Sequence, residues 1–281
     1  MVINASLRAL ISGERVAGSR LSEKLLDELL EEGLLSVVSR GSKKSYRARD
    51  IEALKRFLID KNESYRILEV GTPDSRASMA TETGNSKLLM VRSCPGFPVN
   101  SYEPIDCFLN GKPFVVNPQE GSFMYIADWE KFTIPKDVIV IGVENMENFR
   151  MIRHQKQLFD DYLRSHGLIS RVLFVSRYPQ STDLRNWLTS ISNHYLHFGD
   201  FDLAGIHIYQ SEFQQYLGCS RSSFLIPDDI SFRLKKGSSK RYDEQCEHYR
   251  GISSENQELQ ELINLIRQYR KGYDQEGYID Q

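Results

Sequence analysis

Apolar and polar residues alternate regularly over the second half of the chain. Four short runs of mostly apolar residues, each with the length of a buried strand, lie at 138–143, 171–175, 195–198 and 223–226. Between them, longer stretches with apolar residues at helical spacing lie at 146–166, 182–192 and 205–217. Strands that alternate with helices in this way predict a parallel sheet, because parallel strands need long crossover connections. We therefore expect an α/β domain over residues 136–281, closed by an amphipathic helix at 256–269.

The N-terminal part of the chain shows a different order of elements. It predicts a helix at 3–13, a leucine-rich helix at 21–30, a hairpin of 34–38 with 45–47, and a helix at 49–58. This order is typical of a winged-helix domain, which we expect over residues 1–61. The hairpin tip carries basic residues that suit contact with DNA phosphates, namely Arg40, Lys43, Lys44, Arg47 and Arg49. The alternative is a protein-binding winged helix with a solvated basic loop.

Three other segments give weaker signals. Residues 62–135 predict an α+β connecting region, in which Asn110-Gly111 marks a hairpin turn and Lys112-Pro113 completes the loop. Residues 228–245 predict a basic loop, which is either a phosphate-contacting flap or merely solvated. The polar tail at 270–281 predicts little order.

Composition predicts a soluble, cytoplasmic protein without membrane contact. The 281 residues are 40% hydrophobic and 26% charged, and no run approaches the about 18 apolar residues needed to cross a bilayer. The four cysteines are scattered without Cys-x-x-Cys spacing, which argues against a zinc site and favours a reducing compartment. Because the net charge is −2, DNA binding must rest on local basic patches.

Candidate chemistry gathers where the predicted strands end. Asp200 and Asp202 follow the strand at 195–198, and Glu144 follows the strand at 138–143. The carboxyl ends of parallel strands meet at one edge of a sheet, so these carboxylates are expected to lie close together. Like charges repel unless a cation holds them, and Mg²⁺ prefers oxygen ligands. Asp-x-Asp by itself is usually a helix cap or a solvated turn, and Glu144 is what favours a metal site.

Several motifs resemble those of Toprim domains, which occur in topoisomerases, primases and nucleases. Val143-Glu144-Asn145 and Gly199-Asp200-Phe201-Asp202, with Gly205 and Ile208, resemble most the family of topoisomerase VI A-subunits. The segment at 177–185 is similar to a further motif of that family, although Asp183-Leu184 separates its threonine from its arginine. The sequence Tyr273-Asp274-Gln275-Glu276 resembles the C-terminal motif of JetD, the nuclease subunit of Wadjet-type plasmid-defence systems.

The resemblance implies a Toprim-type parallel sheet with flanking helices and a metal-dependent DNA endonuclease. Asp200 and Asp202 would bind Mg²⁺ or Mn²⁺, and Glu144 would complete the site or transfer protons. Glu276 would hold a second metal ion, while Arg177 and Arg185 would contact phosphates. The implied partners are double-stranded DNA, a second copy of the chain in a homodimer, and a condensin-like SMC ATPase complex active in anti-plasmid or anti-phage defence.

Two other functions stay open at this point. A topoisomerase VI-like transesterase needs an attacking tyrosine, and Tyr46, the only tyrosine in the first 60 residues, lies in the predicted hairpin rather than on a helix. We therefore expect hydrolysis. A non-catalytic DNA-binding or scaffolding subunit would keep the acids for folding or for a structural metal ion. His197 and His207 flank the acids and, without a third histidine at ligand spacing, are expected to be structural or to support the ligands.

Overall fold

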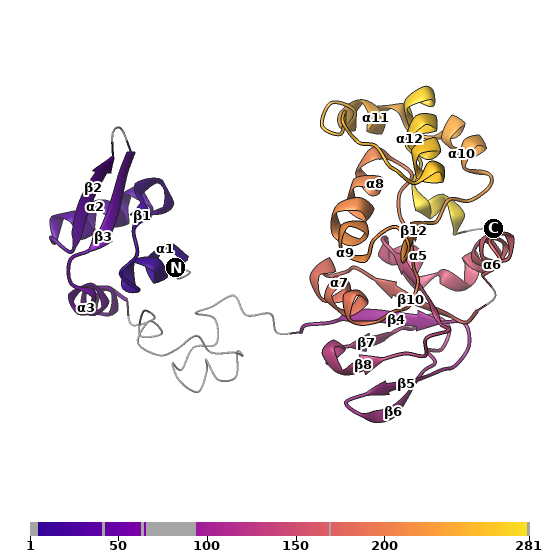
Figure 1. The fold of residues 1–281 in the computed structure, drawn as a ribbon, viewed down its shortest axis with the longest axis horizontal. Helices are drawn as coiled ribbons and strands as arrows, with labels where there is room; N and C mark the ends of the chain where they lie inside the picture. The colour runs from indigo at the N-terminus through magenta and orange to yellow at the C-terminus, as the bar shows by residue number, and fades with distance from the viewer. Residues whose placement is uncertain (1–4, 41–42, 63–64, 66–93, 169, 280–281) are drawn as a thin grey trace. The chain divides into compact units, whose positions relative to one another are not determined.

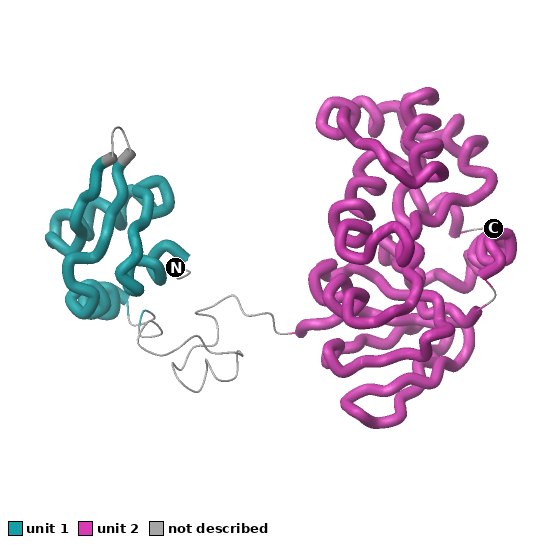
Figure 2. The backbone as a smooth tube through the Cα atoms, viewed as in Figure 1, with its two compact units in different colours: residues 1–93 teal, residues 94–281 magenta. Residues whose placement is uncertain are grey.

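The computed structural model describes residues 5–40, 43–62, 65, 94–168 and 170–279. The chain forms two compact units, residues 1–93 and 94–281, each with its own hydrophobic core (Figure 2). The expected connecting region is thus divided, because its residues 94–135 belong to the second unit and 66–93 lie outside the described residues. No helix within the described ranges is long and apolar enough to span a membrane.

The first unit combines helices with a three-stranded antiparallel sheet of order β1-β3-β2. Its elements are α1 (Ala5–Ile11), β1 (Val16–Ala17), α2 (Glu23–Glu31), β2 (Leu35–Arg40), β3 (Lys43–Ala48) and α3 (Ile51–Lys61). Leucines at helical spacing, such as Leu25 and Leu29 of α2, form its core. Asp50 begins α3, because its carboxylate accepts hydrogen bonds from the N–H groups of Glu52 and Ala53 (2.9 and 3.1 Å).

A six-stranded sheet of order β12-β11-β9-β10-β4-β7 organises the second unit. Its strands are β4 (Phe97–Ser101), β7 (Met124–Ile126), β9 (Ile139–Val143), β10 (Val172–Ser176), β11 (Tyr195–Phe198) and β12 (Ser222–Phe224). The strands from β12 to β10 are parallel, as predicted, whereas β4 and β7 add an antiparallel edge. Every residue of β9, β10 and β11 is buried, which explains their nearly continuous apolar runs. The unit is therefore mixed α/β with a mostly parallel central sheet.

Helices flank this sheet on both faces (Figure 1). They include α5 (Met146–Arg150), α6 (Lys156–Ser165), α7 (Ser181–Ser190), α8 (Leu203–Tyr209), α9 (Gln215–Leu217) and α12 (Gln257–Tyr269). On one face, Phe159 of α6 packs on Phe174 of β10, with ring centroids 5.1 Å apart. On the opposite face, Trp187 of α7 packs on Phe97 of β4, also at 5.1 Å. Since both faces are covered, the strand interiors are mostly apolar, with His197 of β11 as a buried exception.

The predicted helix at 146–166 is not continuous. It consists of α5, a 3₁₀ turn at Ile152–Gln155, and α6. Gln155 is fully buried, and its side-chain amide donates to the carbonyl oxygens of Asn148 and Met151 (2.9 and 3.1 Å). Because these carbonyls are engaged by a side chain, the helical hydrogen-bond ladder is interrupted and the chain bends.

A smaller antiparallel sheet contains β5 (Ile105–Leu109), β6 (Lys112–Val116) and β8 (Phe132–Thr133) in the order β6-β5-β8. The predicted turn joins β5 to β6, and Asn110 and Gly111 both have positive φ, 54° and 73°. Such a turn matches the twist of the two strands. The prediction was wrong for Lys112 and Pro113, which begin β6 instead of completing the loop.

The C-terminal region departs most from expectation. The predicted basic loop at 228–245 forms two helices, α10 (Ile230–Lys236) and α11 (Ser239–Gln245), which gather with α12 at one end of the unit (Figure 1). Ile230 and Leu234 lie one helical turn apart and bury one side of α10. The tail, predicted to have little order, ends in a 3₁₀ turn at Gln275–Tyr278, and Tyr278 is fully buried.

Candidate functional site

The acids predicted to act together lie at the carboxyl ends of two neighbouring strands. β9 and β11 are paired in parallel, with Val143 opposite Phe198. The N–H of Glu144 donates to the carbonyl of Phe198 (3.0 Å), so this residue continues the ladder just beyond β9. Asp200 follows the end of β11 by two residues. Both carboxylates therefore leave the sheet at the same edge.

Asp202 is both a helix cap and a member of this group. It is only 3% exposed, and its Oδ1 accepts from the N–H of Gly205 (2.8 Å) at the start of α8. Its Oδ2 accepts from Gln245 Nε2 (2.9 Å) and from Arg241 Nη1 (3.3 Å). The helix-cap interpretation of Asp-x-Asp is thus correct for one oxygen, while the second oxygen shares Arg241 with Asp200.

Both oxygens of Asp200 have partners. Oδ1 accepts from the N–H of Gln275 (3.0 Å), and Oδ2 accepts from Arg241 Nη1 (3.2 Å). The pKa of Asp200 is raised to about 6, mainly by burial and also by the charges of the neighbouring acids, although the Gln275 hydrogen bond lowers it. These neighbouring acids are Asp202, Glu144 and Glu276. Ionising Asp200 near neutral pH therefore costs free energy unless a cation compensates it.

Glu144 lies beside a buried histidine. His197 of β11 is 1% exposed, and its Nδ1 lies 2.9 Å from the hydroxyl of Tyr195. Its Nε2 lies 3.6 Å from Glu144 Oε2, and neither of these two atoms has a hydrogen-bond partner within the described part of the chain. A buried carboxylate oxygen without a partner fits a further ligand. His197 therefore adjoins the acids, whereas His207 is exposed on α8 and packs on Tyr249 (5.1 Å).

The two arginines predicted to bind phosphates have different surroundings. Arg177 donates to both oxygens of Glu212 (3.1 and 2.7 Å) and to Glu144 Oε1 (3.3 Å). Its guanidinium is thus engaged by acids of the protein itself. Arg185 lies over the ring of Tyr216 at 4.4 Å, which joins α7 to α9. The structure therefore brings Arg177 to the acids through Glu144, and it stacks Arg185 on an aromatic ring.

The C-terminal tail reaches the site as well. Phe201, the residue between the two aspartates, exchanges backbone hydrogen bonds with Tyr273 of the tail (2.9 and 3.1 Å). Glu276 accepts from Asn145 Nδ2 (2.6 Å), next to Glu144. Asp274 contacts Arg241. The tail motif thus lies against both strand ends that carry the acids. The hydrogen-bond partner of the Glu276 carboxylate is the side-chain amide of Asn145, and the charge of Glu276 repels that of Asp200.

The basic hairpin lies in the first unit and is formed by β2 and β3. Lys44 and Arg47 of β3 are exposed, while the side chains of Arg40 and Lys43 lie outside what the structure describes. Tyr46 of the same strand is 7% exposed and belongs to the core of this unit. Most of this side chain is therefore covered by the core of its own unit.

The chemistry of the donor set at the sheet edge fits Mg²⁺ or Mn²⁺, because every candidate ligand is a carboxylate. Across the described ranges, no three or more His, Cys, Asp or Glu side chains already stand so that they could hold a metal ion. Where Asp200 and Asp202 converge, Arg241 supplies the positive charge. Asp200, Asp202 and Glu144 could hold an ion only after their carboxylates draw closer together.

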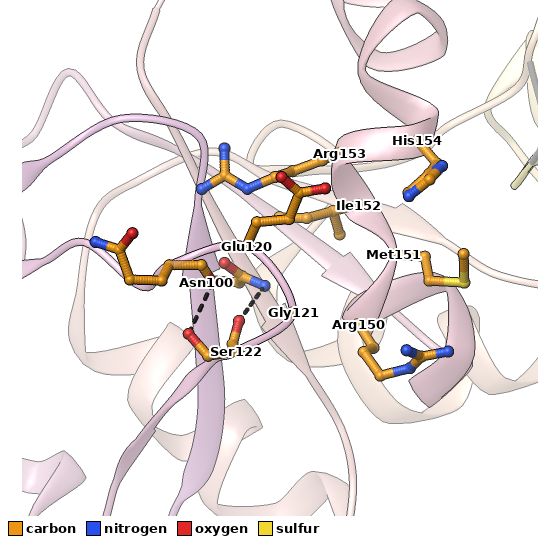
Figure 3. A pocket seen from close by; sticks show the side chains of 10 residues that line it. Asn100, Glu120, Gly121, Ser122, Arg150, Met151, Ile152, Arg153 and His154 are labelled. Carbon is orange, nitrogen blue, oxygen red and sulfur yellow. Dashed lines mark hydrogen bonds between the residues drawn. The ribbon is translucent and has the colours of Figure 1, made fainter.

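A separate cavity of about 100 Å³ lies between the turn at 119–122 and the 3₁₀ turn that precedes α6 (Figure 3). Arg153 lines it, but its guanidinium donates to the carbonyl oxygens of Ser101, Tyr102 and Pro118 (3.2–3.4 Å). This arginine therefore holds loops together. None of the candidate acids lines the cavity.

Gly199 leaves room for the side chains of Glu144 and His197. A Cβ added to Gly199 would lie 2.7 Å from Glu144 Oε2 and 2.8 Å from His197 Nε2. We therefore expect Gly199→Ala to displace the Glu144 carboxylate and to destabilise the second unit by about 1–3 kcal/mol, as overpacking does. Urea unfolding followed by tryptophan fluorescence measures this, because both tryptophans, Trp129 and Trp187, lie in the second unit.

The matched control for this substitution is Gly251→Ala. A Cβ at Gly251 would meet no atom within 4 Å, and its backbone is not in the left-handed region. We expect the unfolding midpoint of this variant to stay close to that of the wild type. Equal unfolding midpoints for the two variants would show that the side chains of Glu144 and His197 can move aside without loss of stability.

Three residues that bind the site belong to no sequence motif, so the sequence does not predict their roles. Glu212 follows α8 and holds Arg177, and Arg241 and Gln245 of α11 bind the aspartates. The chain matches no protein-family model and no curated protein. Its function is therefore inferred from the side chains at this edge of the sheet.

Proposed function

We propose that the protein is a metal-dependent DNA endonuclease that hydrolyses phosphodiester bonds on a Toprim-type sheet. One observation carries the proposal: Glu144 and Asp200 leave neighbouring parallel strands at one edge, with the buried Asp202 beside them. Acids so close repel one another, and the raised pKa of Asp200 reflects burial together with this repulsion. A divalent cation with oxygen ligands, Mg²⁺ or Mn²⁺, would compensate both effects.

Each acid has a distinct task in this proposal. Asp200 and Asp202 would hold the ion, and the ion would polarise the scissile phosphate and lower the pKa of bound water. Glu144 has an unpartnered oxygen, so it is placed to take a proton from the attacking water or to complete the ligand set. Glu276, bonded to Asn145 beside Glu144, would join when a second ion is bound.

Arg177 acts in the proposal on Glu144 rather than on a phosphate. Its bidentate pair with Glu212 fixes the guanidinium plane, and the remaining Nη1 contact holds Glu144 Oε1. On the other side of the carboxylate, His197 lies against Oε2. Glu144 is thereby oriented from two directions, which a residue that transfers protons requires. Arg185 remains a candidate for contact with DNA at the surface.

The wider assembly is part of the same proposal. The order of helices and hairpin in the first unit supports a winged-helix domain, and the exposed Lys44 and Arg47 suit phosphate contact. Cutting both strands of double-stranded DNA needs one such active site per strand, which favours a homodimer. By resemblance to JetD, the protein would be the nuclease of a condensin-like SMC ATPase complex in the cytoplasm, in plasmid or phage defence.

Hydrolysis is favoured over transesterification by one observation. Tyr46 is the only tyrosine in the first 60 residues, where a topoisomerase VI-like reaction would need its nucleophile, and it belongs to the core of the first unit. A side chain packed in this way has little freedom to move toward a phosphate. A water molecule activated at the acids needs no such movement.

Plasmid cleavage tests the proposal. We expect the full-length protein, with its SMC-type partner complex where it is silent alone, to nick or linearise supercoiled DNA with Mg²⁺ or Mn²⁺ and not with EDTA. Glu144→Gln should lower the rate by about 10²- to 10⁴-fold, the usual share of a proton-transferring group. The DNA ends should be free of protein.

Glu147→Gln is the matched control, because Glu147 is exposed on α5 only three residues away. It should cleave like the wild type. Protein attached to the DNA ends would move the protein to the transesterase class. Equal cleavage by wild type and Glu144→Gln, or DNA binding without any metal-dependent cleavage in the complex, would contradict the nuclease proposal.

A further inference from the structure

The positive charge at the centre of the acids comes from the chain itself. Arg241 Nη1 lies 3.2 Å from Asp200 Oδ2 and 3.3 Å from Asp202 Oδ2. The same nitrogen contacts Asp274 Oδ1. Burial alone lowers the pKa of Arg241, but the charges of the three acids outweigh it and leave that pKa above its ordinary value. One guanidinium nitrogen thus stands where three carboxylates converge.

We propose that Arg241 is a resident counter-ion that competes with the divalent metal for Asp200 and Asp202. This inference rests on the proposed metal-dependent function. Mg²⁺ binds carboxylate oxygens at about 2.1 Å and requires near-octahedral geometry. A guanidinium in contact with the same two oxygens occupies that space and repels the ion. The metal therefore binds only when Arg241 leaves, and its affinity is lowered by the contacts that must break.

The element that carries Arg241 is attached in a way that allows this exchange. α11 buries none of its residues in the core. It is tethered at its start by the backbone pair of Ser238 with Gly272 (2.8 and 3.1 Å). At its end, Gln245 binds Asp202 (2.9 Å) and the N–H of Ala204 (3.2 Å). Between its ends, α11 is held by Tyr242, which is partly buried against the core, by the pair of Asp243 with Arg270 (2.9 Å), and by the contacts of Arg241 with the acids.

A glycine shows that the arginine is accommodated next to Asp202. A Cβ added to Gly272 would lie 2.8 Å from the Cβ of Asp202 and 3.3 Å from the Cδ of Arg241. Only a glycine leaves room for the arginine stem and the aspartate together. The tail therefore does more than cover the site, because it supplies both this gap and Asp274, the third acid that binds Arg241.

Two roles of Arg241 predict opposite effects on metal affinity. A competing counter-ion lowers the affinity, so its removal tightens binding. A structural brace holds the two aspartates in place, so its removal weakens binding. The sign of the change in dissociation constant for Arg241→Gln therefore separates them.

The test is Mn²⁺ binding to the full-length protein, measured from the electron paramagnetic resonance signal of free Mn²⁺. We expect Arg241→Gln to lower the dissociation constant by about tenfold, a usual size for coupling between two ligands. Arg241→Lys keeps the charge and should bind Mn²⁺ much like the wild type. Lys240→Gln is the matched control, since Lys240 is the neighbour of Arg241 on α11 and its side chain is 87% exposed. It removes the same charge and should leave the affinity unchanged.

Asp200→Asn in the Arg241→Gln background checks the location of the ion and should weaken binding again. A wild type that binds Mn²⁺ together with an Arg241→Gln variant that binds it equally or more weakly would overturn the inference and leave the metal proposal standing. Equal tightening by Arg241→Gln and Lys240→Gln would reduce it to a general charge effect and overturn it as well. Binding by none of the proteins would remove the metal site and this inference together.

Discussion

Asp200→Asn is expected to abolish cleavage and, at the same time, to stabilise the second unit at pH 8 without metal. The loss of activity should be at least about a thousandfold, because a metal ligand contributes several kcal/mol of transition-state stabilisation. The gain in stability has a different cause. Asparagine is neutral, nearly isosteric, and its oxygen still accepts the hydrogen bond from the N–H of Gln275.

The pH dependence of this gain follows from the raised pKa of Asp200, about 6 against an ordinary value of 3.8. The folded state binds this proton more tightly than the unfolded chain does. Its contribution to stability is thus fully present below the ordinary pKa and is lost as the pH rises through about 6. After a discount for partial exposure, the ionised group at pH 8 costs ~1–2 kcal/mol, which Asp200→Asn avoids. Near pH 4 the two proteins should be almost equally stable.

Urea unfolding in EDTA at pH 8 and pH 4, followed by tryptophan fluorescence, measures this difference. Asp161→Asn serves as control, because Asp161 is exposed on α6 and binds only surface side chains of its own helix, Gln157 (2.7 Å) and Arg164 (2.9 Å), among the described residues. Mn²⁺ at pH 8 should stabilise the wild type and not Asp200→Asn. A variant less stable than the wild type at pH 8 would mean that the contact of Asp200 with Arg241 outweighs burial.

The sheet and the placement of the acids could be predicted from the sequence because both depend on local patterns. β9 and β11 are fully buried, so their residues form short apolar runs that stand out from the rest of the chain. Parallel connections then bring the ends of such strands to one edge. For that reason Glu144, Asp200 and Asp202 are neighbours in space although 58 positions separate the first and last in the chain.

The partners of these acids could not be predicted, because they depend on contacts without a repeating pattern. α11 buries no residue, so it lacks the apolar stripe that marks a helix, and its sequence predicts a loop instead. The tail docks through backbone hydrogen bonds of Tyr273, which leave no trace in residue types. Likewise, Arg177 suits a phosphate by its chemistry, and only the fold shows that Glu212 already holds it.

Tyr278→Ala is expected to cause the largest loss of stability among the substitutions considered. Its ring is fully buried beneath the guanidinium of Arg233 at 4.0 Å and packs near Phe198 and Phe201 (6.1 and 5.7 Å). Removing a buried aromatic ring costs about 3–5 kcal/mol. For a unit of this size, that lowers the thermal midpoint by roughly 10 °C. Tryptophan fluorescence during heating reports the change in the second unit alone.

The same substitution should also affect the site in protein that is still folded. Phe201 stands between Asp200 and Asp202, and its backbone pairs with Tyr273 of the tail. When the ring of Tyr278 is removed, the tail and Phe201 lose their common packing, so the two carboxylates are no longer held. Mn²⁺ binding at 10 °C should therefore weaken even where fluorescence shows a folded unit.

Tyr278→Phe separates the ring from its hydroxyl, which donates to Asp229 Oδ1 (3.0 Å). Losing this hydrogen bond alone should cost about 1 kcal/mol and leave Mn²⁺ binding unchanged. If Tyr278→Ala instead unfolded with the same midpoint as Tyr278→Phe, the tail would be an appendage that the core does not need. Its contacts with the segments that carry Glu144 and Asp200 would then have to form independently of the packing beneath them.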